Sequence, residues 1–97
     1  MKVILEKENY KAEVEIKDEL EWGEQLEIQK ETYKAIQGDT SAMIEAKYKA
    51  LEFAIVSIVE NGKVVPFSRD WMNKLPASFG NKIYDAVDKM KGDKKKD

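Results

Sequence analysis

The feature that most constrains this chain is a strict alternation of apolar and polar residues over positions 10–17. The apolar set is Tyr10, Ala12, Val14 and Ile16. Because side chains of a strand point alternately to the two faces of a sheet, this period predicts a strand with one buried face. Residues 2–6 form a second short β-rich run, and the polar residues 7–9 between the two suit a tight turn. The sequence therefore predicts an N-terminal β-hairpin that needs a cover on one face.

The chain then changes to a helical period. Long and apolar side chains recur at steps of 4, 3, 4 and 3 over residues 20–37, which predicts a helix. The stripe that we expect this helix to bury is Trp22, Leu26, Gln29, Tyr33 and Ile36. Asp18, followed by Glu21 three residues later, resembles a capping box at its start, and Gly38 suits its end.

A second helix is predicted to start at once, capped by Asp39 or Thr40. The same 4-3-4-3 stepping gives it the stripe Ile44, Tyr48, Leu51, Ile55 and Ile58, which Met43, Ala46, Ala50 and Ala54 widen. Two interpretations of residues 54–67 stay open: the Asn61-Gly62 pair is typical of a hairpin turn, whereas the helix could instead run on before an extended loop. We favour a helix that continues to about Val59, with residues 63–67 extended and no central strand, because Pro66 cannot donate to a ladder.

The last third predicts two further helical segments. Ser68 can cap a short helical turn over residues 69–74, which Pro76 stops, and Ser78 can cap a terminal helix. The buried stripe expected of that helix is Phe79, Ile83, Ala86, Val87 and Met90. We predict an α+β fold: an N-terminal β-hairpin followed by a small, mainly helical bundle of about three helices plus a short helical turn. Residues 1–91 should form one globular domain, and residues 92–97 a disordered lysine-rich tail.

Composition argues against several classes of function. Among 97 residues there is neither a histidine nor a cysteine, so the usual general base, thiolate nucleophile and soft metal ligands are missing. We therefore expect no enzyme, no cofactor and no metal site. The net charge of −2 and the single arginine, Arg69, disfavour nucleic-acid binding. No apolar run approaches the roughly 20 residues that span a bilayer, so we expect a cytoplasmic protein without membrane contacts.

Aromatic and methionine side chains are enriched at adaptable binding surfaces, and they supply the candidate site. Phe67, Trp71 and Met72 lie in an irregular, proline-flanked stretch where burial and exposure are about equally expected. The second helix carries more apolar residues than one contact would cover, which adds Met43, Phe53 and Val56. We predict these six as partner-binding residues. The surface on the second helix would serve helix oligomerisation or would hold an extended partner helix.

The order of elements, together with three short stretches, resembles the tail assembly chaperones of long-tailed phages and prophages. The stretches are residues 19–28 (ELEWGEQLEI), within which Leu20, Trp22, Gly23 and Glu24 resemble the family's entry to its first helix, then residues 60–62 (ENG) and the Leu75-Pro76 pair. The resemblance implies a cofactor-free cytoplasmic protein that coats hydrophobic helices of the tape-measure protein and helps to recruit tail-tube subunits. Separately from the resemblance, the apolar excess on the second helix leads us to expect self-association. The alternative is a structural or accessory component of a phage particle that acts through homo-oligomeric contacts.

Overall fold

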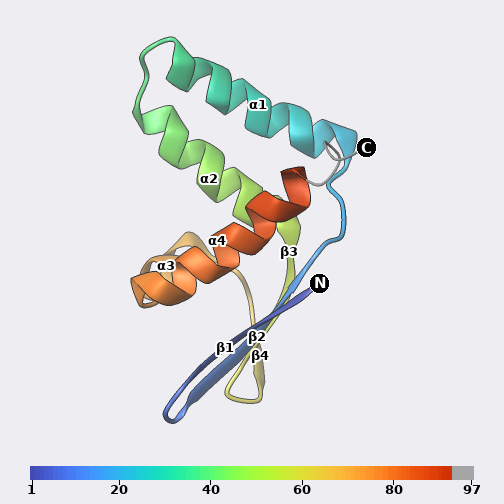
Figure 1. The fold of residues 1–97 in the computed structure, drawn as a ribbon, viewed down its shortest axis with the longest axis vertical. Helices are drawn as coiled ribbons and strands as arrows, with labels where there is room; N and C mark the ends of the chain where they lie inside the picture. Colours follow the sequence, from blue (N-terminus) through green and yellow to red (C-terminus); the bar gives the residue numbers. More distant parts are fainter. Residues whose placement is uncertain (93–97) are drawn as a thin grey trace.

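The computed structural model describes residues 1–92 as a four-stranded antiparallel sheet and four helices (Figure 1). In chain order the elements are β1 (Lys2–Lys7), β2 (Tyr10–Ile16), α1 (Trp22–Ile36), α2 (Ser41–Ala54), β3 (Ile55–Glu60), β4 (Lys63–Val65), α3 (Arg69–Asn73) and α4 (Ala77–Gly92). The predicted α+β class is confirmed, as is the N-terminal hairpin. The predicted tail lies almost wholly outside the described residues, apart from Gly92, which ends α4.

The sheet follows chain order, β1-β2-β3-β4, and every neighbouring pair is antiparallel. The first hairpin closes at Lys7 opposite Tyr10. The central pairing joins distant parts of the chain, since Val14 lies opposite Ile58, and it carries a register shift between Glu15 and Ile16. This pairing brings the first hairpin against the chain that follows α2.

The prediction that the second helix continues to about Val59 without a central strand is wrong. The helix ends at Ala54, and the residues that follow it form β3 and β4, a second hairpin whose turn is Asn61-Gly62. Asn61 and Gly62 both have positive φ (49° and 85°), as a type I′ turn requires. Asn61 Oδ1 also accepts a hydrogen bond of 2.9 Å from the backbone N–H of Lys11. Residues 55–60 form a strand instead of a helix because this β-branched segment can pair with the free edge of β2. Such pairing between distant segments cannot be inferred from helical periodicity.

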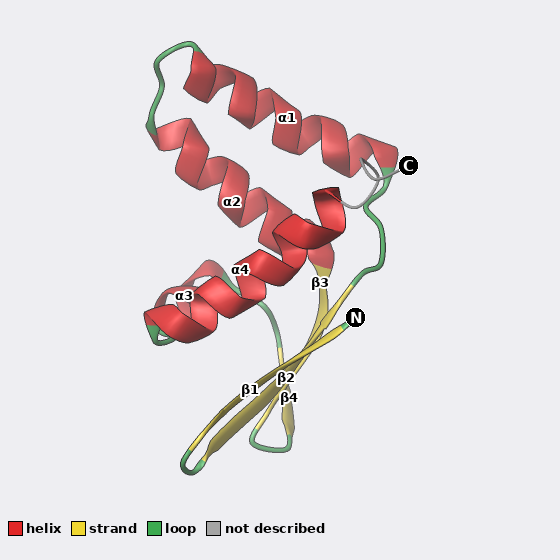
Figure 2. Ribbon diagram, in the orientation of Figure 1, coloured by secondary structure: helices red, strands yellow, loops and turns green. Residues whose placement is uncertain are grey.

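Helix α4 provides the cover that the hairpin needs (Figure 2). Its predicted stripe is confirmed: Ile83, Val87 and Met90 are buried, while Phe79 and Ala86 are partly buried against them. They share one core with residues of the three long strands: Val3, Leu5, Ala12, Val14, Ile16 and Ile58. The helix begins at Ala77, directly after Pro76, and not after Ser78 as predicted.

Helices α1 and α2 form an antiparallel hairpin at the end of the molecule away from the strand tips (Figure 1). Gly38, with φ 109°, supports the short connection between them. Helix α1 starts at Trp22, two residues later than predicted, and its first turn is capped by Glu21 and Glu24 instead of Asp18 and Glu21. The backbone N–H of Glu21 donates to Glu24 Oε1 at 3.0 Å. Among the elements of residues 1–92, α1 packs mainly on α2, and these residues leave one side of α1 without cover.

Candidate functional site: the outer stripe of α1

The uncovered side of α1 carries its largest apolar side chains. The exposed fractions are 74% for Trp22, 46% for Leu26, 62% for Tyr33 and 76% for Ile36. At about 100° per residue, these four and Gln29 fall within roughly 80° of the helix circumference. We call these five residues the outer stripe. A mainly apolar exposed surface of this kind on a small domain is typical of an interaction site.

The opposite side of α1, which faces the rest of the molecule, is poorer in large apolar groups. Its buried residues are Ile28 and Glu31. Helix α2 presents mostly small side chains, since its buried residues are Ala42, Ala46, Ala50, Ala54 and Leu51. Alanines let two helices approach closely but remove little apolar area from water. Helix α1 is therefore amphipathic, but its more apolar side faces the solvent and its more polar side faces α2.

Charged groups complete the inner side of α1. The buried Glu31 carboxylate lies 3.6 Å from Lys34 Nζ and 3.9 Å from Lys49 Nζ of α2. Lys49 Nζ also lies 3.4 Å from Glu27 Oε1. Among the described residues no buried side-chain nitrogen or oxygen lacks a hydrogen-bond partner. The α1–α2 contact is thus held by small side chains and ion pairs.

The prediction that α1 buries Trp22, Leu26, Gln29, Tyr33 and Ile36 is therefore wrong. The helical period is correct, but the buried arc is centred about 150° away, around Ile28 and Glu31. Sequence reasoning identified the outer stripe and assigned it to the core. A signal was available, because α2 carries alanine at every fourth position from 42 to 54, which is typical of a close helix contact needing only a small partner face.

The predicted stripe of α2 is wrong at Ile44 and at Met43, which are exposed. The rest of the stripe within the helix is confirmed: Tyr48 is partly buried, and Ala46, Ala50, Leu51 and Ala54 are buried. Arg69, from the start of α3, binds the exposed side of α2. Its guanidinium donates to both carboxylate oxygens of Glu45, at 2.9 and 2.7 Å, and its Nε donates to Glu52 at 2.8 Å. This contact keeps the pKa of Glu45 below its usual value and fastens α3 to α2.

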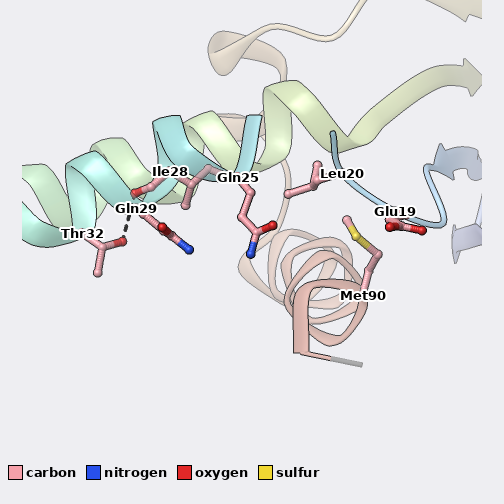
Figure 3. Close-up of a pocket in the computed structure, with 7 residues that line it drawn as sticks. All are labelled: Glu19, Leu20, Gln25, Ile28, Gln29, Thr32 and Met90. Carbon is pink, nitrogen blue, oxygen red and sulfur yellow. Dashed lines mark hydrogen bonds between the residues drawn. The ribbon is translucent and has the colours of Figure 1, made fainter. Parts of the chain in front are cut away.

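A hollow of about 220 Å³ borders the outer stripe, between α1 and the end of α4 (Figure 3). It is lined by Glu19, Leu20, Gln25, Ile28, Gln29, Thr32 and Met90. Figure 3 shows Gln25 and Gln29 on the α1 side and the Met90 side chain on the α4 side. Because Gln29 belongs to both the stripe and the hollow, the two form one continuous surface.

The structure places Phe67, Trp71 and Met72 in or next to α3, where they help to pack α3 against the rest of the molecule. All three are partly buried against the core. Phe67 and Trp71 pack edge to face, with ring centroids 6.4 Å apart. Trp71 borders a groove of about 690 Å³ beside Tyr10 and Phe79, whereas Met72 borders a different hollow beside Tyr84. The three do not converge on one binding surface.

Trp71 also takes part in a polar contact that fixes α3 to the sheet. Its Nε1–H donates to Glu60 Oε2 at 3.2 Å, and the Tyr10 hydroxyl donates to the same oxygen at 2.6 Å. Burial, with help from the Glu60 carboxylate, raises the pKa of Tyr10 well above its ordinary value. Ser68 caps α3 as predicted, accepting from the Trp71 backbone N–H at 3.0 Å.

The other three predicted residues are scattered. Phe53 is partly buried against the core, Met43 is half exposed in the first turn of α2, and Val56 is exposed on β3. Nothing in their placement joins them to α3. Of the six predicted residues, none belongs to the outer stripe.

Two further findings bear on the nature of the site. In residues 1–92, no three acidic side chains come together in a way that could hold a metal ion. Over the same residues, no helix combines the length and the apolar character that a membrane span needs.

Comparison with known proteins adds no relative. No family model matches the chain, and neither a curated protein nor a solved structure matches it.

Proposed function

We propose that this chain is a non-catalytic chaperone that binds hydrophobic helical segments of another protein along the outer stripe of α1. The observation that carries the proposal is the exposure of four large apolar side chains at a helical spacing on one side of α1. A partner helix with its own apolar stripe would remove both surfaces from water, at a gain of roughly 25 cal/mol per Å² of apolar area. Recognition of a helix through anchors at i, i+4 and i+7 is an established mode of peptide binding.

The hollow beside the stripe supports a helix as the partner. A helix lying along α1 projects side chains to both flanks of the contact, and one flank here opens between Gln25 and Met90. The hollow mixes amide groups with apolar walls, so it can accept one protruding apolar side chain. This would fix the partner's position along the stripe.

The absence of His and Cys supports a function without chemistry. Shielding needs only exposed apolar surface and an affinity low enough for later displacement.

The resemblance to phage tail assembly chaperones gives the proposal its specific form. We infer that the partner is the tape-measure protein, whose hydrophobic helices the chain keeps soluble in the cytoplasm, and that tail-tube subunits later replace it. Trp22, which belongs to the short stretch that carries the resemblance, is the first residue of the outer stripe. The same residues thus support both the family and the binding surface.

The test uses a recombinant helical fragment of a phage tape-measure protein, mixed with the chain and analysed by size exclusion and light scattering. The wild-type chain should keep the fragment soluble and elute with it. Ile36→Lys places a charge in the stripe and should abolish this. Val64→Lys is the matched control, because Val64 is 79% exposed on the sheet and Ile36 is 76% exposed on α1.

Equal behaviour of the two variants would overturn the outer stripe as the binding site. Failure of the wild-type chain to co-elute with the fragment would overturn the tape-measure partner. Finding the chain in purified phage particles would favour the structural-component alternative, because a chaperone leaves before assembly is complete.

A further inference from the structure

We propose that, before a partner helix binds, the outer stripe is covered by the outer stripe of a second copy of this chain, packed antiparallel. This inference rests on the proposed function, because it gives the partner-binding surface a resting occupant that the partner must displace. It makes the free protein a reversible dimer whose dissociation exposes the binding site.

The spacing of the stripe is that of a coiled-coil seam. Its members alternate at steps of 4 and 3, so Leu26 and Tyr33 occupy one core position of the heptad, and Trp22, Gln29 and Ile36 the other. The helix has 15 residues, which gives roughly 22 Å of seam at 1.5 Å per residue. A two-helix contact needs a matching seam on the other side, and a second α1 supplies one.

The order of side chains favours an antiparallel pair. The stripe reads large, large, polar, large, large about Gln29. With a twofold axis at Gln29, Trp22 is level with Ile36 of the second copy, and Leu26 lies within one residue of the level of Tyr33. The two Gln29 amides meet on the axis, where each can donate and accept a hydrogen bond. A single polar residue in such a seam fixes its register, and a twofold contact is the commonest form of self-association.

The available area predicts a weak dimer, which is what displacement by a partner requires. Large side chains contribute roughly 150–250 Å² each when fully exposed, so the exposed fractions given above leave about 500 Å² of side-chain surface per copy. A pair of copies therefore buries about 1,000 Å², the lower limit for a specific interface. The other strongly exposed apolar residues, such as Val56 and Val64, lie outside α1 and do not extend the seam.

The first experiment is sedimentation velocity of the chain over a wide range of concentrations. We expect a concentration-dependent dimer. Gln29→Lys places two like charges on the axis and should raise the dissociation constant at least about tenfold, while Val64→Lys should leave it unchanged. A wild-type chain that stays monomeric throughout would overturn the inference, as would a dimer that Gln29→Lys does not weaken.

The second experiment tests orientation through disulfide formation, which is simple to interpret because the chain has no native cysteine. In the antiparallel pair Gln29→Cys lies on the axis and should cross-link on oxidation, whereas Ile36→Cys faces residue 22 of the other copy and should not. Cross-linking of Ile36→Cys as fast as Gln29→Cys would overturn the antiparallel arrangement.

Failure of the inference can be separated from failure of the proposed function. If the chain is monomeric and still keeps the tape-measure fragment soluble, the dimer is overturned and the chaperone stands. If the dimer forms but the fragment never dissociates it, both the proposed chaperone function and the displacement of the dimer by a partner helix are overturned. That result would support the alternative of a structural component that acts through homo-oligomeric contacts.

Discussion

The two ends of the molecule each carry an amphipathic helix, α4 at one end and α1 at the other, but only α4 buries its apolar side. Helix α4 turns Ile83, Val87 and Met90 into a core shared with three strands, and all three are buried. Helix α1 has an equally regular stripe but turns Trp22 and Ile36 to solvent. Helix α4 buries its apolar side against other parts of the chain, whereas α1 leaves its apolar side exposed to solvent.

This difference shows that helical periodicity reports which side of a helix is apolar, and not which molecule covers it. The sheet has one apolar face, and α4 already covers it. Helix α1 is left with α2, whose inner side is built of alanines. Because no other described part of the chain covers this stripe, it is the surface at which we propose that a partner binds.

The largest effect should come from the sheet–α4 end. Leu5 is completely buried in the core, so Leu5→Ala should lower the free energy of unfolding by about 2–5 kcal/mol through lost burial and a residual cavity. Urea denaturation measures it. A loss below about 1 kcal/mol would contradict the contrast between the two ends, because the sheet–α4 core would then contribute little to the free energy of unfolding.

A smaller effect should come from the inner side of the α1–α2 hairpin. Lys49→Met leaves the buried Glu31 with Lys34 as its remaining described cation, which should cost about 1–2 kcal/mol because both partners of the lost pair are only partly exposed. Adding Glu31→Leu should recover most of the loss, since an apolar pair of similar volume needs no counter-charge. If the double variant is less stable than Lys49→Met alone, Glu31 has a role in this contact that its ion pairs do not explain.

The contact between the sheet and α3 should contribute about 1 kcal/mol and depend on pH. Tyr10→Phe removes the hydrogen bond to Glu60, so the variant should be less stable by about 1 kcal/mol at neutral pH. Folding raises the pKa of Tyr10 above its ordinary value of 10, so above pH 10 the unfolded chain loses this proton while the folded chain keeps it. The wild-type advantage over Tyr10→Phe should therefore be constant below pH 10 and shrink above it. Denaturant titrations of both proteins across that range measure it, and an advantage that grows with pH would contradict the assignment.

The smallest effect should come from the outer stripe itself. Ile36→Ser changes a side chain that is 76% exposed, so the free energy of unfolding should move by less than about 0.5 kcal/mol in dilute solution. Denaturation of dilute protein avoids the contribution of any dimer. A loss comparable to that of Leu5→Ala would mean that the stripe is part of the chain's own core, which would remove the distinction between the two helices.

Local signals were enough to predict much of the fold. The alternation of residues 10–17 fixed β2, the Ser68 cap fixed α3, and the stepping from Phe79 to Met90 fixed the buried side of α4. Each of these three predictions depends on residues close together in the sequence, or on one apolar side of an element that must be buried against the sheet.

The parts that could not be predicted depend on pairing between distant segments. Residues 55–60 fit either a helix or a strand, and the free edge of β2 decided between them. The candidate site was missed for a related reason. Trp22 and Phe79 both lie in regular stripes, and only the arrangement of α4 over the sheet shows which stripe is already covered. Trp71 is bonded to Glu60 and borders a groove, and its role as a binding residue stays a prediction.

The two tryptophans allow one direct test of the central claim, since Trp22 lies in the outer stripe and Trp71 in the site that the sequence predicted. The measurement is a ¹⁵N–¹H spectrum of the chain titrated with an amphipathic leucine-heptad peptide, following the two indole N–H signals. We predict that the Trp22 signal shifts and saturates while the Trp71 signal, held by Glu60, stays in place. A shift at Trp71 with Trp22 unmoved would contradict the outer stripe as the binding surface.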